Sequence, residues 1–579
     1  MGNRPWSDTS SIADLFSLKI FKIPDYQRTY AWERQNWEDF WNDIKEGLDT
    51  DTTHYWGTIT LRDTDELKKR KHKHYRIFEV VDGQQRLTSI YLFLFALAEA
   101  GLQELREEYI KSGDLYRIEL GSLNKDFLFD IVNGRDPKAK LQTNQRLNGI
   151  LGYFRNQVRT YQESGNDLGK LVEYFLNNTL SLEFQVSDEN MAIRAFQSLN
   201  DRGKDLTLLD KTKSFLMFYS SKYLNSSLSQ VINKNFGHIF EHYDFIEAHG
   251  REANISYISN PRYRFSEDEL LRFFYHYFAR YAIKKYELRG IAYDYTVTTA
   301  GVFKSFLKQS CYQIKDDKEK LQDFIEDFLE SFELFVKSFR GLVERALEES
   351  PYRRLFSFLG LSATVYPLII ALEAENMLDD RLLTAIEVLD LRVYKVRGTN
   401  PRANLYTNTI SRIKLDGNSS KAYQSIHSFT REFMRDPEFQ VYLDRGMYRN
   451  PATKYILWEY EVHQTPAFDK WGLDLYNKLQ IEHIFPREPT FGFPAYGFEE
   501  ADYLERIDRL GNLILLEEEI NKRIGNRVPE VKAQDYQGSK VRGTERLGYT
   551  IDSNGFSQND VQKRTEKITS FCLERWSIY

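Results

Sequence analysis

The chain has 579 residues, and this length predicts about three or four domains rather than one. Hydrophobic residues make up 41% of the chain and charged residues 28%, a balance that excludes an intrinsically disordered protein. The formal net charge of −6 excludes the strongly basic profile of a histone-like protein, although local basic patches still permit contacts with DNA.

The cysteine content limits the possible metal sites and disulfides, and the hydropathy indicates the cellular location of the protein. The two cysteines, Cys311 and Cys572, form no CxxC pair, which excludes a structural zinc site built from cysteines and disfavours a disulfide framework. The N-terminus lacks the apolar segment of a signal peptide, and no apolar run reaches the roughly 18 residues of a transmembrane helix. We therefore expect a cytoplasmic protein that does not contact a membrane.

Residues 1–215 mix predicted strands with predicted helices. The strand segments are β-branched or aromatic and are bounded by turn residues. They alternate with segments of helical hydrophobic periodicity. The predicted strands cover residues 18–24, 54–61, 75–83 and 180–186, and the predicted helices cover residues 36–48 and 87–101.

Residues 216–440 are predicted to be mostly helical. The clearest helix runs from Asp317 to Glu349, where apolar residues recur every three or four positions, and its aromatic stripe indicates packing rather than a ligand site. The segment 398–406 interrupts the helical pattern and predicts a loop. In the remaining residues, 441–579, Ser557 is predicted to cap a final helix.

The segment VVDGQQRLTSI predicts a strand that ends at Asp82 and a helix that begins near Leu87. Gly83 permits the tight turn between them, and N–H groups at a helix N-terminus bind anions. Arg86 can add a charge-assisted contact to phosphate, and Asp82 can hold a metal or activate water. These residues predict a phosphate site. The competing interpretation is a surface turn in which Asp82 caps the helix.

Three further segments of the N-terminal region are polar. IPDYQRTYAW sets Gln27 and Arg28 before a helix, and LNDRGKDL offers Asn200 and Arg202 for contacts with a base edge and a phosphate. A plain helix–loop–helix connection is the alternative for the second segment. The run KKRKHKH, residues 68–74, can track a DNA backbone or form a solvated hairpin tip. No Walker A loop occurs.

Near the C-terminus the chain reads LQIEHIFP, and RLGNLILLEEEINKRIGN follows about thirty residues later. A neutral His483 can take a proton from water near pH 7. A hard cation held by carboxylate and amide oxygens can stabilise charge on a phosphate. Glu482 precedes the histidine, and Asn512, Asn521 and Asn526 follow in the second segment.

This pattern resembles an HNH, or His-Me finger, nuclease, in which a strand carries an acidic residue followed by the catalytic histidine. The resemblance implies that His483 is the general base and that Glu482 and Asn521 are metal ligands. Asn512, expected on a second strand, would brace the loop and orient His483. Many members have Asp where this chain has Glu482. Lys532 or Arg487 would neutralise the phosphate.

Together these motifs resemble the GmrSD family of type IV restriction endonucleases. IPxYQRxYxW, DGQQR and LNDRGKxL match its N-terminal half, whereas IEHIFP, GNLILL and the residues Asn521, Asn526 and Lys532 match its C-terminal half. The resemblance implies an α+β multidomain protein. A ParB/sulfiredoxin-like nucleotide-binding domain would span residues 1–215, a helical coupling domain residues 216–440, and an HNH (His-Me finger) nuclease domain residues 441–579.

The resemblance further implies that the N-terminal domain binds and hydrolyses a nucleoside triphosphate, such as GTP or ATP. Asp82 and Arg86 would then take part in nucleotide hydrolysis. The implied nucleotide site comprises Gln27, Arg28, Asp82, Gly83, Gln84, Gln85, Arg86, Asn200 and Arg202.

By the same resemblance, we expect a phage-defence endonuclease that cleaves foreign, modified DNA with Mg²⁺ or Mn²⁺ and is gated by nucleotide. One active site cuts one strand at a time, so a double-strand break needs a homodimer or two sequential nicks. Two other interpretations stay open: a nucleotide-sensing DNA-binding regulator without cleavage, and a nuclease toxin directed at the host.

Overall fold

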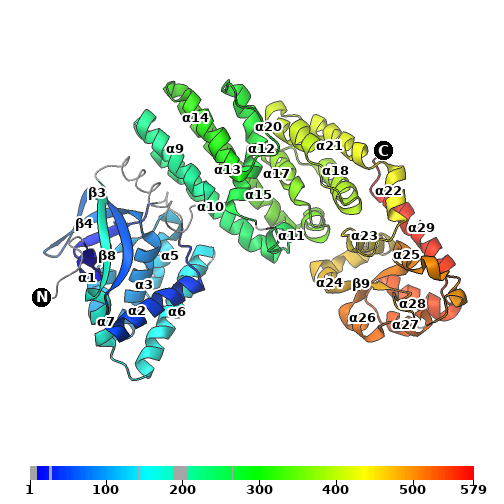
Figure 1. Cartoon of the computed structure of the whole chain (residues 1–579), viewed down its shortest axis with the longest axis horizontal. Helices are drawn as coiled ribbons and strands as arrows, with labels where there is room; N and C mark the ends of the chain where they lie inside the picture. The colour runs from blue at the N-terminus through cyan, green and yellow to red at the C-terminus, as the bar shows by residue number, and fades with distance from the viewer. Residues whose placement is uncertain are drawn as a thin grey trace.

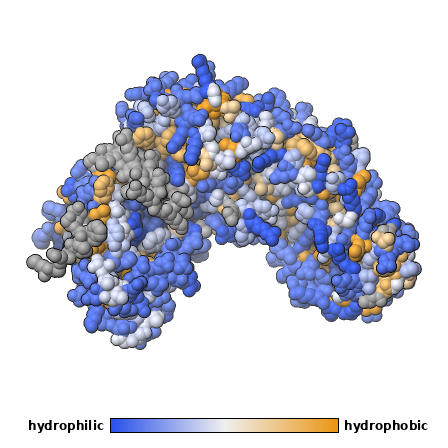
Figure 2. Space-filling model, in the orientation of Figure 1, coloured by the Kyte–Doolittle hydropathy of each residue, from blue (hydrophilic) through white to orange (hydrophobic). Residues whose placement is uncertain are grey.

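The computed structural model describes residues 9–24, 29–139, 142–186, 207–263, 265–489 and 491–578. These residues form an arch: an N-terminal α+β domain is one arm, a layer of helices is the top, and the C-terminal residues are the other arm (Figure 1). The space between the two arms is open on the face shown in Figure 2. None of the described helices combines the length and apolar character needed to cross a membrane.

The N-terminal domain is built on a mixed sheet with the strand order β1-β8-β3-β4-β2-β7. Strands β3 and β4 form a long antiparallel hairpin, whereas β2 runs parallel to β4 and β8 runs parallel to β3. All four predicted strands are confirmed. The strands are β1 (Thr9–Ser11), β2 (Lys19–Lys22), β3 (His54–Arg70), β4 (Lys73–Asp82), β7 (Ile118–Glu119) and β8 (Thr179–Val186).

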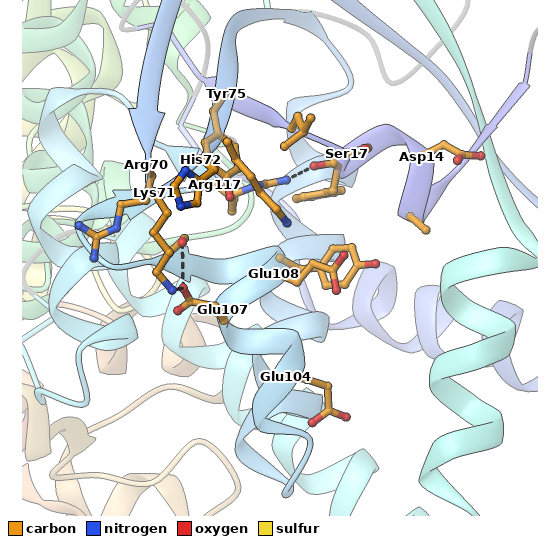
Figure 3. Close-up of a pocket in the computed structure, with 16 residues that line it drawn as sticks. Asp14, Ser17, Arg70, Lys71, His72, Tyr75, Glu104, Glu107, Glu108 and Arg117 are labelled. Atoms are coloured by element: carbon orange, nitrogen blue, oxygen red, sulfur yellow. Dashed lines mark hydrogen bonds and ion pairs between the residues drawn. The ribbon is translucent and has the colours of Figure 1, made fainter.

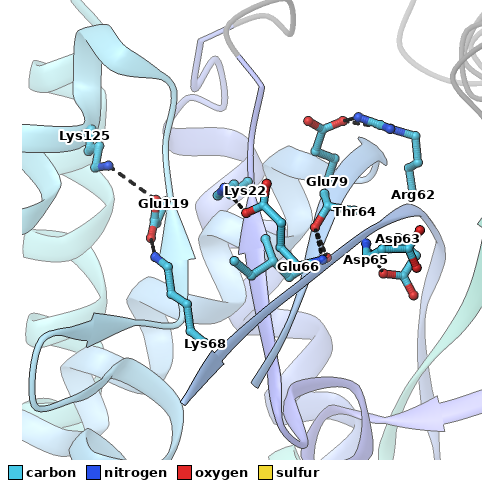
Figure 4. A network of polar contacts seen from close by, with 11 residues as sticks. Lys22, Arg62, Asp63, Thr64, Asp65, Glu66, Lys68, Glu79, Glu119 and Lys125 are labelled. Atoms are coloured by element: carbon cyan, nitrogen blue, oxygen red, sulfur yellow. Dashed lines mark hydrogen bonds and ion pairs between the residues drawn. The ribbon is translucent and has the colours of Figure 1, made fainter. Parts of the chain in front are cut away.

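Ion pairs tie the strands together on the polar side of this sheet (Figure 4). Arg62 of β3 donates to Glu79 of β4. Glu119 of β7 accepts from Lys68 at 2.8 Å and from Lys125 at 3.3 Å. Burial alone would raise the pKa of Glu119, but these two lysines lower it below its ordinary value.

Helix α3 (Gln84–Glu99) is the centre of the N-terminal core, and every residue from Leu87 to Ala98 is buried. A helix buried on all sides suits its continuous apolar run, LTSIYLFLFALA. The surrounding helices are α1 (Ile12–Phe16), α2 (Arg34–Thr50), α5 (Ser122–Val132), α6 (Gln142–Glu163) and α7 (Leu168–Asn177). A short hairpin of β5 (Lys111–Ser112) and β6 (Leu115–Tyr116) completes the domain.

The middle region is helical, as predicted. Helix α15 (Lys318–Glu348) confirms the predicted 317–349 helix, and its apolar stripe is buried. The 398–406 segment begins with irregular backbone and then re-enters a helix. Helix α9 crosses the predicted domain boundary at residue 215. The larger helices are α9 (Leu208–Leu224), α10 (Ser229–Glu252), α12 (Glu267–Lys285), α17 (Tyr366–Ala374), α18 (Asp380–Leu389), α21 (Ser419–Phe433) and α22 (Asp436–Leu443).

In the C-terminal arm, β9 (Leu479–His483) pairs antiparallel with β10 (Leu513–Glu517). Leu513 and Leu515 of β10 face the large hydrophobic cluster that spans the helical middle and the C-terminal arm. Ile514 and Leu516 face a smaller cluster within the arm, as strand alternation requires. Around this hairpin lie α23 (Thr453–Gln464), α24 (Gly472–Lys478), α25 (Tyr503–Ile507), α26 (Glu518–Ile524), α27 (Pro529–Tyr536), α28 (Arg542–Asn554) and α29 (Gln558–Arg575).

Candidate active site

His483 is the last residue of β9 and pairs with Leu513 of β10. Its side chain is 8% exposed, and the Tyr448 ring lies 4.2 Å from the imidazole. The imidazole Nε2 lies 2.8 Å from Oδ1 of Asp508. An ionised carboxylate only accepts hydrogen bonds, so Nε2 carries the hydrogen and Nδ1 is the nitrogen that can accept a proton.

The environment of His483 favours its neutral form. Burial lowers the pKa of His483 below its ordinary value of 6.5, and the hydrogen bond and charge of Asp508 offset part of that decrease. A histidine that is neutral and oriented by a carboxylate at neutral pH is suited to act as a general base.

Asp508 was not identified from the sequence. It lies between α25 and the one-turn 3-10 helix Leu510–Asn512. Its backbone carbonyl accepts from the N–H groups of Met447 at 2.6 Å and Tyr448 at 3.2 Å, and Arg487 lies 3.7 Å from its carboxylate. The backbone bonds fix the carboxylate against the imidazole. The only sequence signal is an acidic residue four positions before Asn512 in RIDRLGN.

Asn512 braces the loop that follows His483. Its Oδ1 accepts from the N–H of Phe485 at 2.9 Å, and its Nδ2 donates to the carbonyls of Phe485 at 3.1 Å and Ile507 at 2.8 Å. The residue is fully buried, so its side chain holds the loop and does not face solvent. One expectation needs correction: Asn512 ends the 3-10 turn and β10 begins one residue later, because the Asn512 N–H bonds the carbonyl of Arg509.

Helix α29 packs against the same loop. Nη1 of Arg564 donates to the carbonyls of Leu510 at 3.2 Å, Gly511 at 2.9 Å and Leu513 at 2.7 Å. The Gly511 N–H donates to Oγ1 of Thr565 at 3.0 Å. A Cβ at Gly511 would lie 1.9 Å from the Val561 carbonyl oxygen, so only glycine permits this approach. Ser557 and Asp560 form the expected capping box of α29.

Glu482 and Asn521 lie on neighbouring elements. Asn521 on α26 donates from Nδ2 to Oε1 of Gln480 at 2.8 Å. Gln480 and Glu482 are two residues apart on β9, so both side chains are on one face of the strand. The Asn521 amide and the Glu482 carboxylate are therefore on the same side of the hairpin. Asn526 is exposed, with Nδ2 3.5 Å from Glu488.

Lys532 was expected to meet phosphate, but the structure buries it completely. Its Nζ donates to Oε1 of Glu482 at 2.6 Å and to the His483 carbonyl at 2.7 Å. Burial raises the pKa of Glu482 and lowers that of Lys532, and the mutual attraction of the pair opposes both shifts. Lys532 therefore holds Glu482 in place from behind.

The oxygen atoms of Glu482 and Asn521 fit a hard cation that binds few protein ligands. The described residues contain no cluster of three or more His, Cys, Asp and Glu side chains placed to hold a metal. One carboxylate and one amide oxygen suit Mg²⁺ or Mn²⁺, because Mg²⁺ usually keeps water and substrate phosphate among its ligands. Glu482 and Asn521 are the residues that would supply these two oxygens.

At the other end of the arch, β4 ends at Asp82 and α3 begins at Gln84, which confirms the predicted strand–turn–helix junction. Gly83 takes a φ of 91°, in the left-handed region that favours glycine. The Asp82 carboxylate lies 3.3 Å from Nη2 of Arg86. Gly83 caps α3 without a side-chain bond, so Asp82 is not the cap.

Contacts within the N-terminal domain fix the side chain of Arg86. Its Nη1 donates to the Trp56 carbonyl at 2.8 Å. A Cβ on Gly57 would lie 2.1 Å from Nη1, so Gly57 makes room for the guanidinium. Gln85 links the turn to the preceding motif: its Oε1 accepts from the Ala31 N–H at 2.8 Å, and its Nε2 donates to the Thr29 carbonyl at 3.1 Å.

The structure thus brings DGQQR beside the end of the IPDYQRTYAW segment. Gln27, Arg28, Asn200 and Arg202 lie outside the described residues. The DGQQR turn and the β9–β10 hairpin are on opposite arms of the arch, so the two candidate sites are separate (Figure 1).

Comparison with protein families gives two matches. Residues 12–217 match the model described as "GmrSD restriction endonuclease, N-terminal domain", and residues 431–571 match "GmrSD restriction endonucleases, C-terminal domain". The chain belongs to the GmrSD restriction endonuclease family. A search of curated proteins found no match.

The two GmrSD matches enclose the two candidate sites. The N-terminal match covers DGQQR, and the C-terminal match covers His483, Asp508, Asn512 and Asn521. GmrSD membership supports a type IV restriction nuclease, and a restriction endonuclease has DNA as its substrate. The helical residues 218–430 lie between the two matches.

Proposed function

We propose that this GmrSD protein hydrolyses phosphodiester bonds of foreign, modified DNA at the β9–β10 hairpin. The observation that carries the proposal is the bond between Nε2 of His483 and Asp508, which leaves Nδ1 as a proton acceptor. The antiparallel hairpin followed by α26, with Asn521 on the helix, supports an HNH-type arrangement.

In the proposed reaction, Nδ1 of His483 takes a proton from a water molecule, whose oxygen attacks the phosphorus. The P–O3′ bond breaks as the new P–O bond forms. Asp508 stabilises the imidazolium that results, and Asn512 holds the loop at Phe485. A divalent cation bound by Glu482 and Asn521 would stabilise the negative charge of the phosphate and of the leaving oxygen. Arg487, half-exposed beside Asp508, can contact the phosphate.

The proposed gate is the DGQQR turn. The glycine turn at the N-terminus of α3 supports this proposal, because Asp82 and Arg86 lie beside it. A helix N-terminus of this kind can bind a nucleotide phosphate. Because the turn and the hairpin are on opposite arms, coupling between nucleotide and cleavage would pass through the helical middle.

A cleavage assay tests this proposal. Purified protein is incubated with plain and base-modified DNA, with Mg²⁺, Mn²⁺ or EDTA, and with or without ATP and GTP. We expect DNA cleavage only when a metal is present. We also expect nucleotide to change the cleavage rate of the wild type but not that of Asp82→Asn. Equal cutting with and without nucleotide would contradict the proposed nucleotide gate but leave the proposed nuclease activity intact. Nucleotide hydrolysis without any cutting would instead favour a nucleotide-sensing regulator.

Replacing Asp508 should shift the pH dependence of cleavage. The base works when deprotonated, so the acidic limb of the wild-type profile should have its midpoint below 6.5. Asp508 raises the pKa of His483, so Asp508→Asn should move that midpoint to lower pH and reduce kcat by about 10–100-fold. The measurement is kcat against pH. Asp552→Asn, an exposed carboxylate on α28, is the control, and an unmoved midpoint in Asp508→Asn would contradict the assignment.

A further inference from the structure

A cavity lined largely by charged residues lies in the N-terminal arm, at the tip of the β3–β4 hairpin (Figure 3). Its volume is about 830 Å³. Pockets that enclose small ligands have volumes of about 300–1,000 Å³, so this cavity can hold a molecule the size of a nucleotide. The walls come from the hairpin tip, from α1, and from residues 104–117.

Cations line the side of the cavity formed by the hairpin. Arg70 and Lys73 are paired across the turn, and Lys71 and His72 form the turn itself. These residues are the middle of the KKRKHKH run, so the structure confirms a hairpin tip and shows that its cations border a cavity. A Cβ at Gly113 would lie 1.9 Å from Nη2 of Arg70, so the guanidinium is seated against the β5–β6 turn.

Arg117 is the most buried charge in the cavity wall, with 3% exposure. One nitrogen, Nη2, donates to the Phe16 carbonyl, and the guanidinium lies 4.8 Å from the Tyr75 ring centroid. Its buried Nε has no hydrogen-bond partner among the described residues. Burial lowers the pKa of Arg117, and the nearby Tyr75 and Glu108 oppose this shift.

Carboxylates also line the cavity, and one of them forms an ion pair with a cation of the hairpin tip. Glu104, Glu107 and Glu108 come from the opposite wall, and Asp14 comes from α1. Glu107 accepts from Ser112 and lies 3.7 Å from Lys71. Within the described part of the chain, Arg70, Lys73 and Arg117 form no ion pair with any carboxylate. Arg117 is the buried member of this set, whereas Arg70 is partly buried and Lys73 is exposed. Buried charges are normally paired, so an anionic group from outside the domain would complete the contacts of Arg117.

The two walls define the ligand. A phosphate satisfies the guanidinium and ammonium groups, because arginine binds phosphate oxygens bidentately. The facing carboxylates accept hydrogen bonds, so they suit amino or hydroxyl donors on the same ligand. A nucleotide combines a phosphate with such donors. We propose that this cavity binds the phosphate of a nucleotide unit, either free in solution or within a DNA strand.

This site is distinct from the DGQQR turn. Strand β4 has 10 residues, with the hairpin tip at its start and Asp82 at its end. At about 3.3 Å per residue, the two sites are roughly 30 Å apart along the strand. The proposal also does not depend on cleavage, since it concerns binding in the arm opposite the β9–β10 hairpin.

The test compares two lysines of the same hairpin. Lys73 lines the cavity, whereas Lys69 is exposed on the hairpin and does not line it. Full-length wild type, Lys73→Gln, Arg70→Gln and the control Lys69→Gln are titrated with ATP, with GTP, and with a single-stranded oligonucleotide at two salt concentrations. We expect Lys73→Gln and Arg70→Gln to weaken binding by about tenfold and to reduce the salt dependence, while Lys69→Gln changes little.

The probes separate the two sources of the phosphate. Weaker binding of ATP or GTP alone identifies a free nucleotide, and weaker binding of the oligonucleotide alone identifies a DNA strand. Thermal unfolding checks that the variants remain folded. If Lys73→Gln and Arg70→Gln bind every probe as the wild type does, or if Lys69→Gln weakens binding equally, the proposal is overturned and the hairpin cations are only solvated.

Discussion

His483→Ala should reduce DNA cleavage by about 10²–10⁴-fold, because general base catalysis contributes rate factors of that size. Alanine removes both the proton acceptor and the partner of Asp508. The expected loss is in kcat, since Glu482, Asn521 and Arg487 remain to bind metal and phosphate. Cleavage rates of a defined DNA substrate, measured under single-turnover conditions with saturating protein, give the effect directly.

The matched control is His463→Ala. His463 is an exposed histidine in α23 of the same arm, and its ring lies 5.0 Å from that of Phe571. The His463→Ala variant should cleave DNA at the wild-type rate. Undiminished cleavage by His483→Ala would place the base on another residue, and a loss in both variants would indicate a general effect on the arm.

Arg564→Met should have the second large effect. Methionine keeps much of the aliphatic stem and removes the donor shared by the carbonyls of residues 510, 511 and 513. Hydrogen bonds to a charged donor contribute about 1.5–3 kcal/mol, so we expect the free energy of unfolding to fall by about 2–3 kcal/mol. The loop that carries Asn512 should also shift, and a shift of about 1 Å can reduce catalysis by about 10²-fold.

Chemical denaturation and cleavage rates measure these two effects separately. Lys563→Met is the control, because Lys563 is the exposed neighbour on α29. Arg564→Lys keeps the charge but loses the planar guanidinium, so it should recover stability only in part. Normal cleavage by a folded Arg564→Met protein would show that α29 does not position the loop.

Local sequence patterns predicted the parts of the fold that local physics determines. The DGQQR junction is an example, because a β-branched strand, a glycine and a long apolar run specify β4, the turn and α3 in succession. The aromatic stripe of α15 and the capping box at Ser557 are others. The order of the strands in the sheet was not predicted, because β8 pairs with β3 across more than a hundred residues.

At the candidate site, the sequence motifs anticipated some of the side-chain contacts, whereas contacts between distant elements were missed. Asn512 braces the loop as expected from GNL. Asp508 contacts an imidazole 25 residues earlier in the chain, and Arg564 reaches the loop from the last helix. Lys532 shows the converse: its position in the chain resembles a phosphate ligand, but burial behind Glu482 gives it another role.

The β9–β10 hairpin also limits how this protein can be divided. Its two faces belong to different hydrophobic clusters, one of them shared with the helical middle. A two-stranded hairpin is marginally stable by itself. Trp458 and Tyr476 of the arm pack against Phe358 of the helical middle, so residues 441–579 expressed alone would expose these two aromatic rings and should aggregate. The N-terminal arm has its own cluster, from Ile12 to Phe175. Chimaeras between family members should thus exchange that arm and keep residues 208–578 as one unit.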